Sequence, residues 1–204
     1  ATQVQLGFLP NKRPEIVELE FFDYYEAAHR VGGDYFDYVP LPDGRVAVAV
    51  ADVAGKGIPA ALLMARLYSA ARYHLLSDAS LADALTGLNR DISISGLGHR
   101  FITCVLLIVD ARQREVTMAN AGHLPPLVKE QDGTISEWIT EHTGMPLGIV
   151  PDQQFHQEVR TLEPGDTWLM FTDGITEAMN EQSEIFGSER LQSSLARGPH
   201  PLDQ

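Results

Sequence analysis

The chain has 204 residues, 44% of them hydrophobic, and its 15 Lys and Arg against 28 Asp and Glu give a formal net charge of −13. This composition is typical of a folded globular protein, and the negative charge disfavours binding to nucleic acid or an anionic membrane surface, because such binding depends on cationic side chains. No apolar run reaches the ~18–20 residues that a membrane-spanning helix needs, and the single cysteine, Cys104, excludes an internal disulfide and a multi-cysteine zinc site.

The first half of the chain predicts strands followed by a pair of helices. Apolar residues that alternate with glutamates indicate a half-buried strand near its start. A Pro-Asp-Gly turn between two apolar runs indicates a hairpin, and a proline before an Ala- and Leu-rich stretch indicates a helix with proline in its first turn. In chain order, we expect strands at 17–21, 34–41 and 45–52, and helices at 59–76 and 81–93.

The second half predicts further strands and one late helix. The expected strands lie at 101–110, 115–121, 127–128, 135–139, 154–161 and 167–172, and a last helix begins over 188–195. Because hairpins pair antiparallel, a doubly wound parallel sheet is disfavoured. We therefore expect an α+β protein, with two antiparallel sheets and helices packed outside them.

The hairpin turn determines which residues face each other across the first two strands. If Leu41 pairs with Arg45, paired residue numbers sum to 86, and Asp34 lies opposite Asp52. Opposed Cβ atoms lie ~4.5–5.5 Å apart, so two carboxylates there repel unless a cation or a shared proton lies between them. Carboxylate oxygens suit the hard cations Mg²⁺ and Mn²⁺. The alternative is a pair of solvated strand-end carboxylates that never meet.

Other segments offer further candidates. Asp173 ends an apolar run as Asp52 does, so it is either a third acid of the same site or part of an Asp-Gly turn. The glycines around Lys56 could present N–H groups to a phosphate, but we favour a role in a tight strand-to-helix turn. His123 precedes a rigid proline-rich segment, and we interpret it as shaping the loop rather than touching substrate.

Cys104 lies in an apolar strand, and we expect its side chain to be buried in the core. A buried thiol disfavours a phosphatase that uses cysteine as its nucleophile.

Five motifs then point to a known family. They are Val31–Asp37 (VGGDYFD), Asp52–Gly57 with the following Pro59-Ala60-Ala61, Asn120–Pro126, Met145–Gly148 and Phe171–Ala178. In this order they resemble the PPM metal-dependent serine/threonine phosphatases of the bacterial SpoIIE/RsbU branch, over most of the chain. The resemblance implies an α/β/β/α sandwich of two antiparallel sheets flanked by helices. It also implies that residues 1–204 form a single phosphatase domain excised from a longer multidomain regulator.

The resemblance also assigns roles to individual residues. Asp52 would bridge two divalent cations, Mn²⁺ or Mg²⁺, and the Val53 carbonyl would bind one of them. Asp34 and Asp173 would hold the other cation, so Asp34, Asp52 and Asp173 are the expected catalytic residues. Asp37, the second acid of the Gly-Gly-Asp motif, is expected to support these ligands without binding metal itself.

Three features bear on how closely the chain follows the family's pattern. The family usually ends in an Asp-Asp-x-Thr segment that supplies another metal ligand, and this sequence stops at Gln204 without it, which leaves the completeness of ligation open. Ala54 stands where eukaryotic relatives have a histidine that acts as a general acid, so water would protonate the leaving oxygen here. Arg30 is a candidate phosphate-binding residue, although an ordinary surface role at a strand start is the simpler interpretation.

The implied activity is hydrolysis of phosphoserine or phosphothreonine on a signalling protein by a metal-activated hydroxide, without a covalent phosphoenzyme. The implied substrate is a phosphorylated STAS-type anti-sigma-factor antagonist, with an upstream sensor or receiver domain as a partner and a homodimer as one possible assembly. We expect a cytoplasmic protein without nucleic-acid partners or membrane insertion. The alternative function is a non-catalytic, phosphatase-like module that binds a partner and reports a signal.

Overall fold

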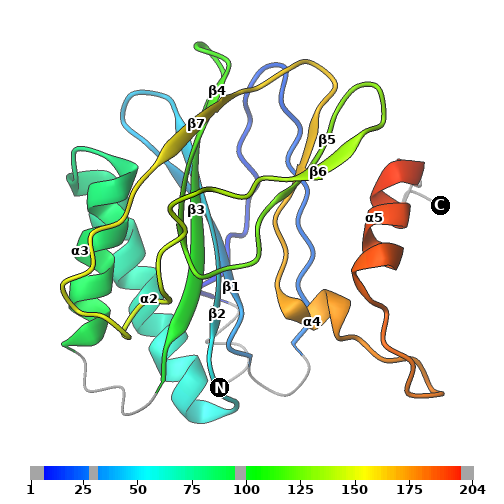
Figure 1. The fold of residues 1–204 in the computed structure, drawn as a ribbon. Helices are drawn as coiled ribbons and strands as arrows, with labels where there is room; N and C mark the ends of the chain where they lie inside the picture. The colour runs from blue at the N-terminus through cyan, green and yellow to red at the C-terminus, as the bar shows by residue number, and fades with distance from the viewer. Residues whose placement is uncertain (1–6, 28–31, 95–99, 199–204) are drawn as a thin grey trace. The chain divides into compact units, whose positions relative to one another are not determined.

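The computed structural model describes residues 7–27, 32–94 and 100–198, so the candidate Arg30 lies outside the described residues. The chain divides into two units (Figure 1). The first comprises Ala1–His123 and Thr140–Leu162, and the second comprises Leu124–Ile139 and Glu163–Gln204.

A five-stranded antiparallel sheet forms the centre of the first unit. Its order is β1-β2-β3-β4-β7, and every neighbouring pair is antiparallel. The strands are β1 (Tyr35–Pro40), β2 (Val46–Val53), β3 (Ile102–Asp110), β4 (Glu115–Ala121) and β7 (Glu158–Thr161). Because β2 and β3 lie in the interior of the sheet, they are almost continuously buried, as their apolar sequences predict.

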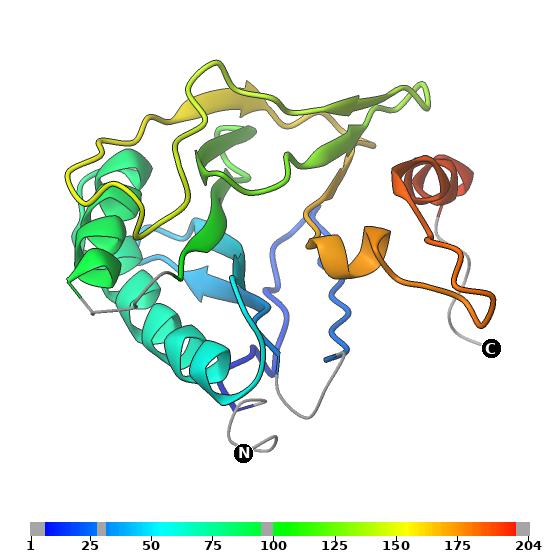
Figure 2. The same ribbon diagram turned by 60° about the horizontal axis from the view of Figure 1, so that its bottom comes forward.

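Two helices of the first unit lie side by side over one face of this sheet (Figures 1 and 2). They are α2 (Ile58–Ser77) and α3 (Leu81–Ser93). Pro59 lies in the first turn of α2, where its missing N–H costs nothing. Ser80 caps α3, because its hydroxyl accepts a hydrogen bond from the Asp83 N–H at 3.1 Å. Within the described ranges, no helix is both long and apolar enough to cross a membrane.

The core of the first unit lies between these helices and the sheet. Alternate residues of β2 that face the helices are the small residues Ala47, Ala49 and Ala51, each 0% exposed. Small side chains on the strand let large ones on the helices fill the layer, and Met64 and Leu85 are also fully buried there. The sheet face that contacts α2 and α3 is therefore a mainly apolar packing surface.

The second unit contains a smaller antiparallel sheet and two helices. The elements are β5 (Leu127–Lys129), β6 (Ile135–Glu137), β8 (Thr167–Leu169), α4 (Asp173–Thr176) and α5 (Ser188–Arg197), and the sheet order is β6-β5-β8. Leu127, Phe171 and Leu191 form its small core. The Lys129 ammonium donates to the Leu195 carbonyl at 3.0 Å, which satisfies an acceptor at the C-terminal end of α5.

The predicted α+β class with two antiparallel sheets is confirmed, and both long helices lie within one or two residues of their expected bounds. Two predicted strands that follow each other in the sequence do not pair, however. The strands predicted at 154–161 and 167–172 are adjacent in sequence, but β7 pairs with β4 and β8 pairs with β5, so they belong to different sheets. Pairing with partners distant in sequence overrides the local turn pattern there.

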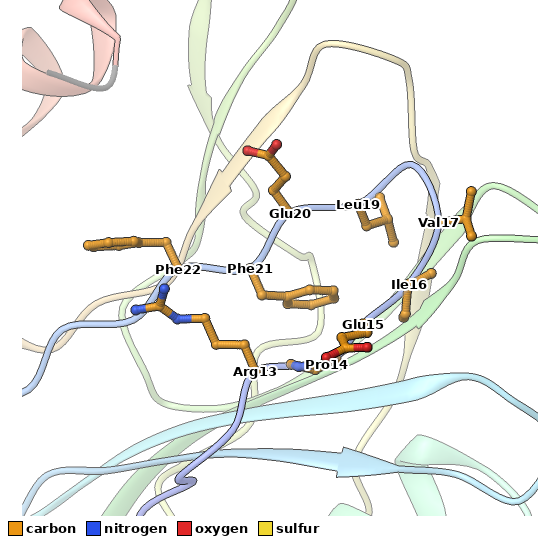
Figure 3. Close-up of a pocket in the computed structure, with 9 residues that line it drawn as sticks. All are labelled: Arg13, Pro14, Glu15, Ile16, Val17, Leu19, Glu20, Phe21 and Phe22. Atoms are coloured by element: carbon orange, nitrogen blue, oxygen red, sulfur yellow. The ribbon is translucent and has the colours of Figure 1, made fainter. Parts of the chain in front are cut away.

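The strand predicted at 17–21 is also wrong. Glu18 has a φ of 72°, a left-handed conformation that interrupts an extended strand, and the Leu19 N–H donates to the Ile16 carbonyl across a tight turn. Val17, expected to be inward-facing, is 86% exposed. Residues 13–22 instead loop around a pocket of about 720 Å³ (Figure 3), and none of the predicted site residues lines it.

Candidate metal centre

The first hairpin places two acids directly across from each other. β1 and β2 pair in the predicted register, with Tyr35 opposite Ala51, and Asp34 and Asp52 are the next pair outward. One further backbone hydrogen bond joins the two chain segments beyond them, from the Val53 N–H to the Gly33 carbonyl at 3.3 Å. The predicted register of the hairpin is therefore confirmed from Tyr35 to Pro40, and extending it by one residue places Asp34 across from Asp52.

The ladder geometry brings these two side chains close. Hydrogen-bonded and non-hydrogen-bonded pairs alternate along an antiparallel ladder, and a single backbone hydrogen bond joins Val53 to Gly33 one residue beyond the two acids. Asp34 and Asp52 therefore occupy a non-hydrogen-bonded position, where opposed side chains approach most closely. Both are half-buried. Two carboxylates in this position repel each other unless a cation neutralises them.

Gly33 leaves room for two oxygen atoms beside this pair. A Cβ at position 33 would lie 2.7 Å from the Val53 carbonyl oxygen and 3.1 Å from Asp52 Oδ1. The first distance is too short for any side chain, so glycine is required here for space. The Val53 carbonyl and the Asp52 carboxylate, both predicted metal ligands, thus lie against the same bare stretch of backbone.

Strand β3 places a polar residue next to Asp52 in the sheet. Thr103 is its partner in the ladder, and the Thr103 hydroxyl lies 2.9 Å from Nδ1 of His123. The backbone of His123 is held by Asn120, whose side-chain oxygen accepts from the His123 N–H at 2.8 Å and whose amide donates to the His123 carbonyl at 3.1 Å. These contacts support the interpretation of His123 as a residue that shapes its loop. They also show that the His123 ring contacts Thr103, the residue next to Asp52 in the sheet. The sequence did not reveal this contact.

Asp37 does not support the metal ligands as the sequence analysis expected. It lies an odd number of residues from Asp34 along β1, so its side chain points to the opposite, helix-covered face. There it is 0% exposed and accepts two hydrogen bonds from Arg72 of α2, at 2.6 and 2.8 Å. The Tyr35 hydroxyl and the Tyr38 N–H also donate to it. Asp37 therefore fastens α2 to β1.

Two other residues singled out in the sequence, Cys104 and Asp173, lie in opposite environments. Cys104 is fully buried, and burial raises the pKa of its thiol to about 12, which confirms the packing role and makes it a poor nucleophile. Asp173 is exposed at the start of α4 in the second unit, and its membership of the metal site remains a prediction of the sequence.

The groups that the first unit brings together fit a hard divalent cation. The carboxylates of Asp34 and Asp52 and the carbonyl of Val53 are all oxygen donors, the kind that Mg²⁺ and Mn²⁺ prefer. Gly33 keeps the space beside two of these donors free of any side chain. Among the residues that the structure describes, no group of three or more His, Cys, Asp or Glu side chains is arranged to hold a metal ion.

Sequence comparison identifies relatives of this chain. A family model described as "Stage II sporulation protein E (SpoIIE)" matches residues 42–204. The phosphoserine phosphatase RsbU of Bacillus subtilis is 32% identical over 182 residues, which cover 89% of this chain and 53% of RsbU. The chain spans between about a third and about a half of the length of the first curated relatives that it matches.

Structural comparison gives the same grouping. The crystal structure of the RsbU and RsbW domains of Rv1364c from Mycobacterium tuberculosis superposes with a TM-score of 0.71 at 28% identity, covering 83% of this chain and 46% of that one. The SiaA-PP2C domain of Pseudomonas aeruginosa superposes with a TM-score of 0.77 at 24% identity, covering 96% and 78%. The second likeness supports the fold alone.

Proposed function

This chain belongs to the SpoIIE family of PPM-type protein phosphatases, and from that premise we propose that it hydrolyses phosphoserine or phosphothreonine on a signalling protein. The observation that carries the proposal is the opposition of Asp34 and Asp52 at a non-hydrogen-bonded position, beside the Val53 carbonyl. A repelling acid pair is costly to keep in a sheet, and a role in binding cations explains why it is there. The name of RsbU, phosphoserine phosphatase, supports the choice of substrate.

We assign the metal ligands as Asp34, Asp52, the Val53 carbonyl and Asp173, with Mn²⁺ or Mg²⁺ as the two cations. When bound, the cations would lower the pKa of a water molecule towards neutrality and neutralise charge on the phosphoryl oxygens. The chain's own contribution is to hold the oxygen donors in place. The β1–β2 ladder sets the spacing of Asp34 and Asp52.

The substrate class follows from charge. With a formal net charge of −13, the chain offers no long-range attraction to a small anionic phosphate ester. A protein substrate can offset this with contacts remote from the phosphate. From the family resemblance, we propose a phosphorylated STAS-type anti-sigma-factor antagonist as the substrate, acted on in the cytoplasm and under the control of an attached sensor or receiver domain.

The test is a steady-state assay with Mn²⁺ on two substrates, p-nitrophenyl phosphate and a phosphoserine-bearing antagonist protein. We expect slow turnover of the aryl ester and a much higher kcat/KM for the phosphoprotein. Asp52→Asn should lose both activities. Asp43→Asn, in the turn at the other end of the same hairpin, should keep both and serves as the control for an equal loss of charge. Absence of turnover in the metal-loaded wild type would leave the non-catalytic module as the better reading.

A further inference from the structure

The hydroxyl of Tyr25 is buried without a hydrogen-bond partner among the described residues. Such orphaned groups are uncommon in native structures, since leaving a buried polar atom unpaired costs about 1–3 kcal/mol. A phenol can be replaced by the equally large Phe without this cost. A tyrosine that keeps an unsatisfied hydroxyl therefore points to a partner outside the described residues.

The surroundings of this hydroxyl indicate where that partner binds. A Cβ at Gly32 would lie only 2.7 Å from the Tyr25 oxygen, so the hydroxyl lies against the backbone of the Gly-Gly-Asp motif. Burial raises the pKa of the Tyr25 phenol, and the negative charge of Asp34 raises it further. The phenol is thus a protonated donor within electrostatic reach of the Asp34 carboxylate, yet it makes no hydrogen bond to it.

The two glycines of the motif therefore serve one purpose. Gly32 makes room for the hydroxyl of Tyr25, and Gly33 makes room for the Val53 carbonyl and the Asp52 carboxylate. Neither glycine has the positive φ that would require it for backbone conformation. The backbone at positions 32 and 33 therefore carries no side chains. The Tyr25 hydroxyl, the Val53 carbonyl and the Asp52 carboxylate all lie close to it.

Tyr25 is also held in position by the segment to which it belongs. Its ring packs against Phe36 with a centroid separation of 6.4 Å, on the Asp34 face of β1. The Tyr38 hydroxyl donates to the Phe22 carbonyl at 3.3 Å, and the Arg13 guanidinium stacks over the Phe22 ring at 4.7 Å (Figure 3). The Tyr38 bond fastens the segment just before Tyr25 to β1, and the Arg13 stacking ties it to the preceding part of the chain.

We propose that the Tyr25 hydroxyl donates a hydrogen bond to an oxygen atom bound beside Asp34, and that Tyr25 is therefore a ligand-contacting residue of this site. The oxygen belongs either to the phosphoryl group of the substrate or to a water that accompanies the cation. The inference rests on the proposed function for the identity of the ligand. The geometry that supports it, an unpartnered donor against the Gly-Gly-Asp backbone, is independent of turnover.

The test uses Tyr25→Phe, which removes only the hydroxyl, and Tyr24→Phe as the control. Tyr24 is the neighbouring residue, and its exposed hydroxyl bonds to Glu26 rather than facing the acid pair. Calorimetry first measures Mn²⁺ binding to each protein, and then binding of inorganic phosphate to the Mn²⁺-loaded proteins. We expect Tyr25→Phe to weaken one of these steps about tenfold or more, as befits a hydrogen bond to a charged group, and Tyr24→Phe to change neither.

The two arms separate the sources of the oxygen. Weaker phosphate binding with unchanged Mn²⁺ binding assigns the acceptor to the phosphoryl group, and weaker Mn²⁺ binding assigns it to water on the cation. Unchanged affinity in both arms, with the same unfolding midpoint as the wild type, overturns the inference. If Tyr25→Phe weakens binding but the wild type hydrolyses no phosphoprotein, the proposed function fails while the role of Tyr25 stands.

Discussion

Strand β1 has two faces that put similar residues to opposite uses. On the helix-covered face, Asp37 is fully buried, and its charge is balanced by Arg72 and by donors from Tyr35 and Tyr38. On the other face, Asp34 lies across from a second acid, Asp52. The Asp37 carboxylate is paired with an arginine, whereas the Asp34 carboxylate is placed across from a like charge.

The difference shows why a motif cannot be assigned one role as a whole. Asp34 and Asp37 belong to the same seven-residue motif, but the two-residue period of the strand sends them to different environments. The helix-covered face stabilises the fold, and the opposite face carries the acid pair that we propose to bind cations. Such local conflicts with stability are expected at functional sites.

The largest effect should come from Asp52→Asn on the acid-pair face. We expect kcat/KM on a phosphoserine substrate to fall about 10²–10³-fold, because a residue that positions charge at the reacting phosphate is lost. The free energy of unfolding without metal should stay the same or rise, since a like-charge repulsion is removed. Kinetics with Mn²⁺ and urea unfolding in EDTA measure the two quantities. A large loss of metal-free stability would contradict the division of roles between the faces.

Arg72→Leu, on the helix-covered face, should lower stability and leave activity unchanged. It leaves the buried Asp37 charge without its cation, so the free energy of unfolding should fall by about 2–4 kcal/mol. The folded fraction should keep its kcat. Arg66→Leu is the matched control, because Arg66 is an exposed arginine of the same helix, and it should cost about 0.5 kcal/mol or less. Equal losses in the two variants would mean that the Asp37 bond contributes little.

A pair of glycine substitutions should sharpen the comparison. In Gly33→Ala, the new Cβ would press on the Val53 carbonyl and on Asp52, and we expect Mn²⁺ affinity to fall about tenfold. In Gly87→Ala, the new Cβ would meet the His74 ring at 2.5 Å, between α2 and α3. That change should lower stability and leave Mn²⁺ affinity intact. Calorimetry and urea unfolding on both variants would show whether the two kinds of damage separate.

The smallest expected effect is the contribution of Cys104 to the pH dependence of the free energy of unfolding. Burial raises the pKa of this thiol to about 12 in the folded state, compared with ~8.5 when unfolded. The neutral thiol therefore favours folding at low pH, and this contribution is progressively lost as the pH rises above about 8.5, by about 1 kcal/mol near pH 9. Unfolding measured between pH 7 and 10 should show a steeper decline for the wild type than for Cys104→Ala. Parallel curves would show that the thiol does not titrate differently in the two states.

Much of the fold was predictable because its determinants are local. The Pro-Asp-Gly turn fixed the register that places Asp34 across from Asp52, and Pro59 and Ser80 mark the starts of the two long helices. The errors arise where distant contacts decide. The alternation of apolar residues with glutamates predicted a strand around Val17, but the chain turns at Glu18, which has a positive φ.

The site was predictable in part for the same reason. Asp34 and Asp52 belong to one hairpin, so counting from its turn located them. The bond between Thr103 and His123 joins residues from separate strand ends, and Tyr25, which lies against the Gly-Gly-Asp motif, comes from a segment that packs on Phe36. No spacing in the sequence encodes these contacts. The face of Asp37, in contrast, could have been predicted from strand alternation once Asp34 was placed.

The central claim is that Asp34 and Asp52 form a site for divalent cations, and thermal unfolding in a Mn²⁺ titration tests it most directly. A ligand that binds only the folded state stabilises it by about 2.7 kcal/mol at a hundred times its Kd. We predict that the wild type gains stability in this way and that the double variant Asp34→Asn/Asp52→Asn does not. A flat response of the wild type up to millimolar Mn²⁺, or an undiminished response of the double variant, would contradict the claim.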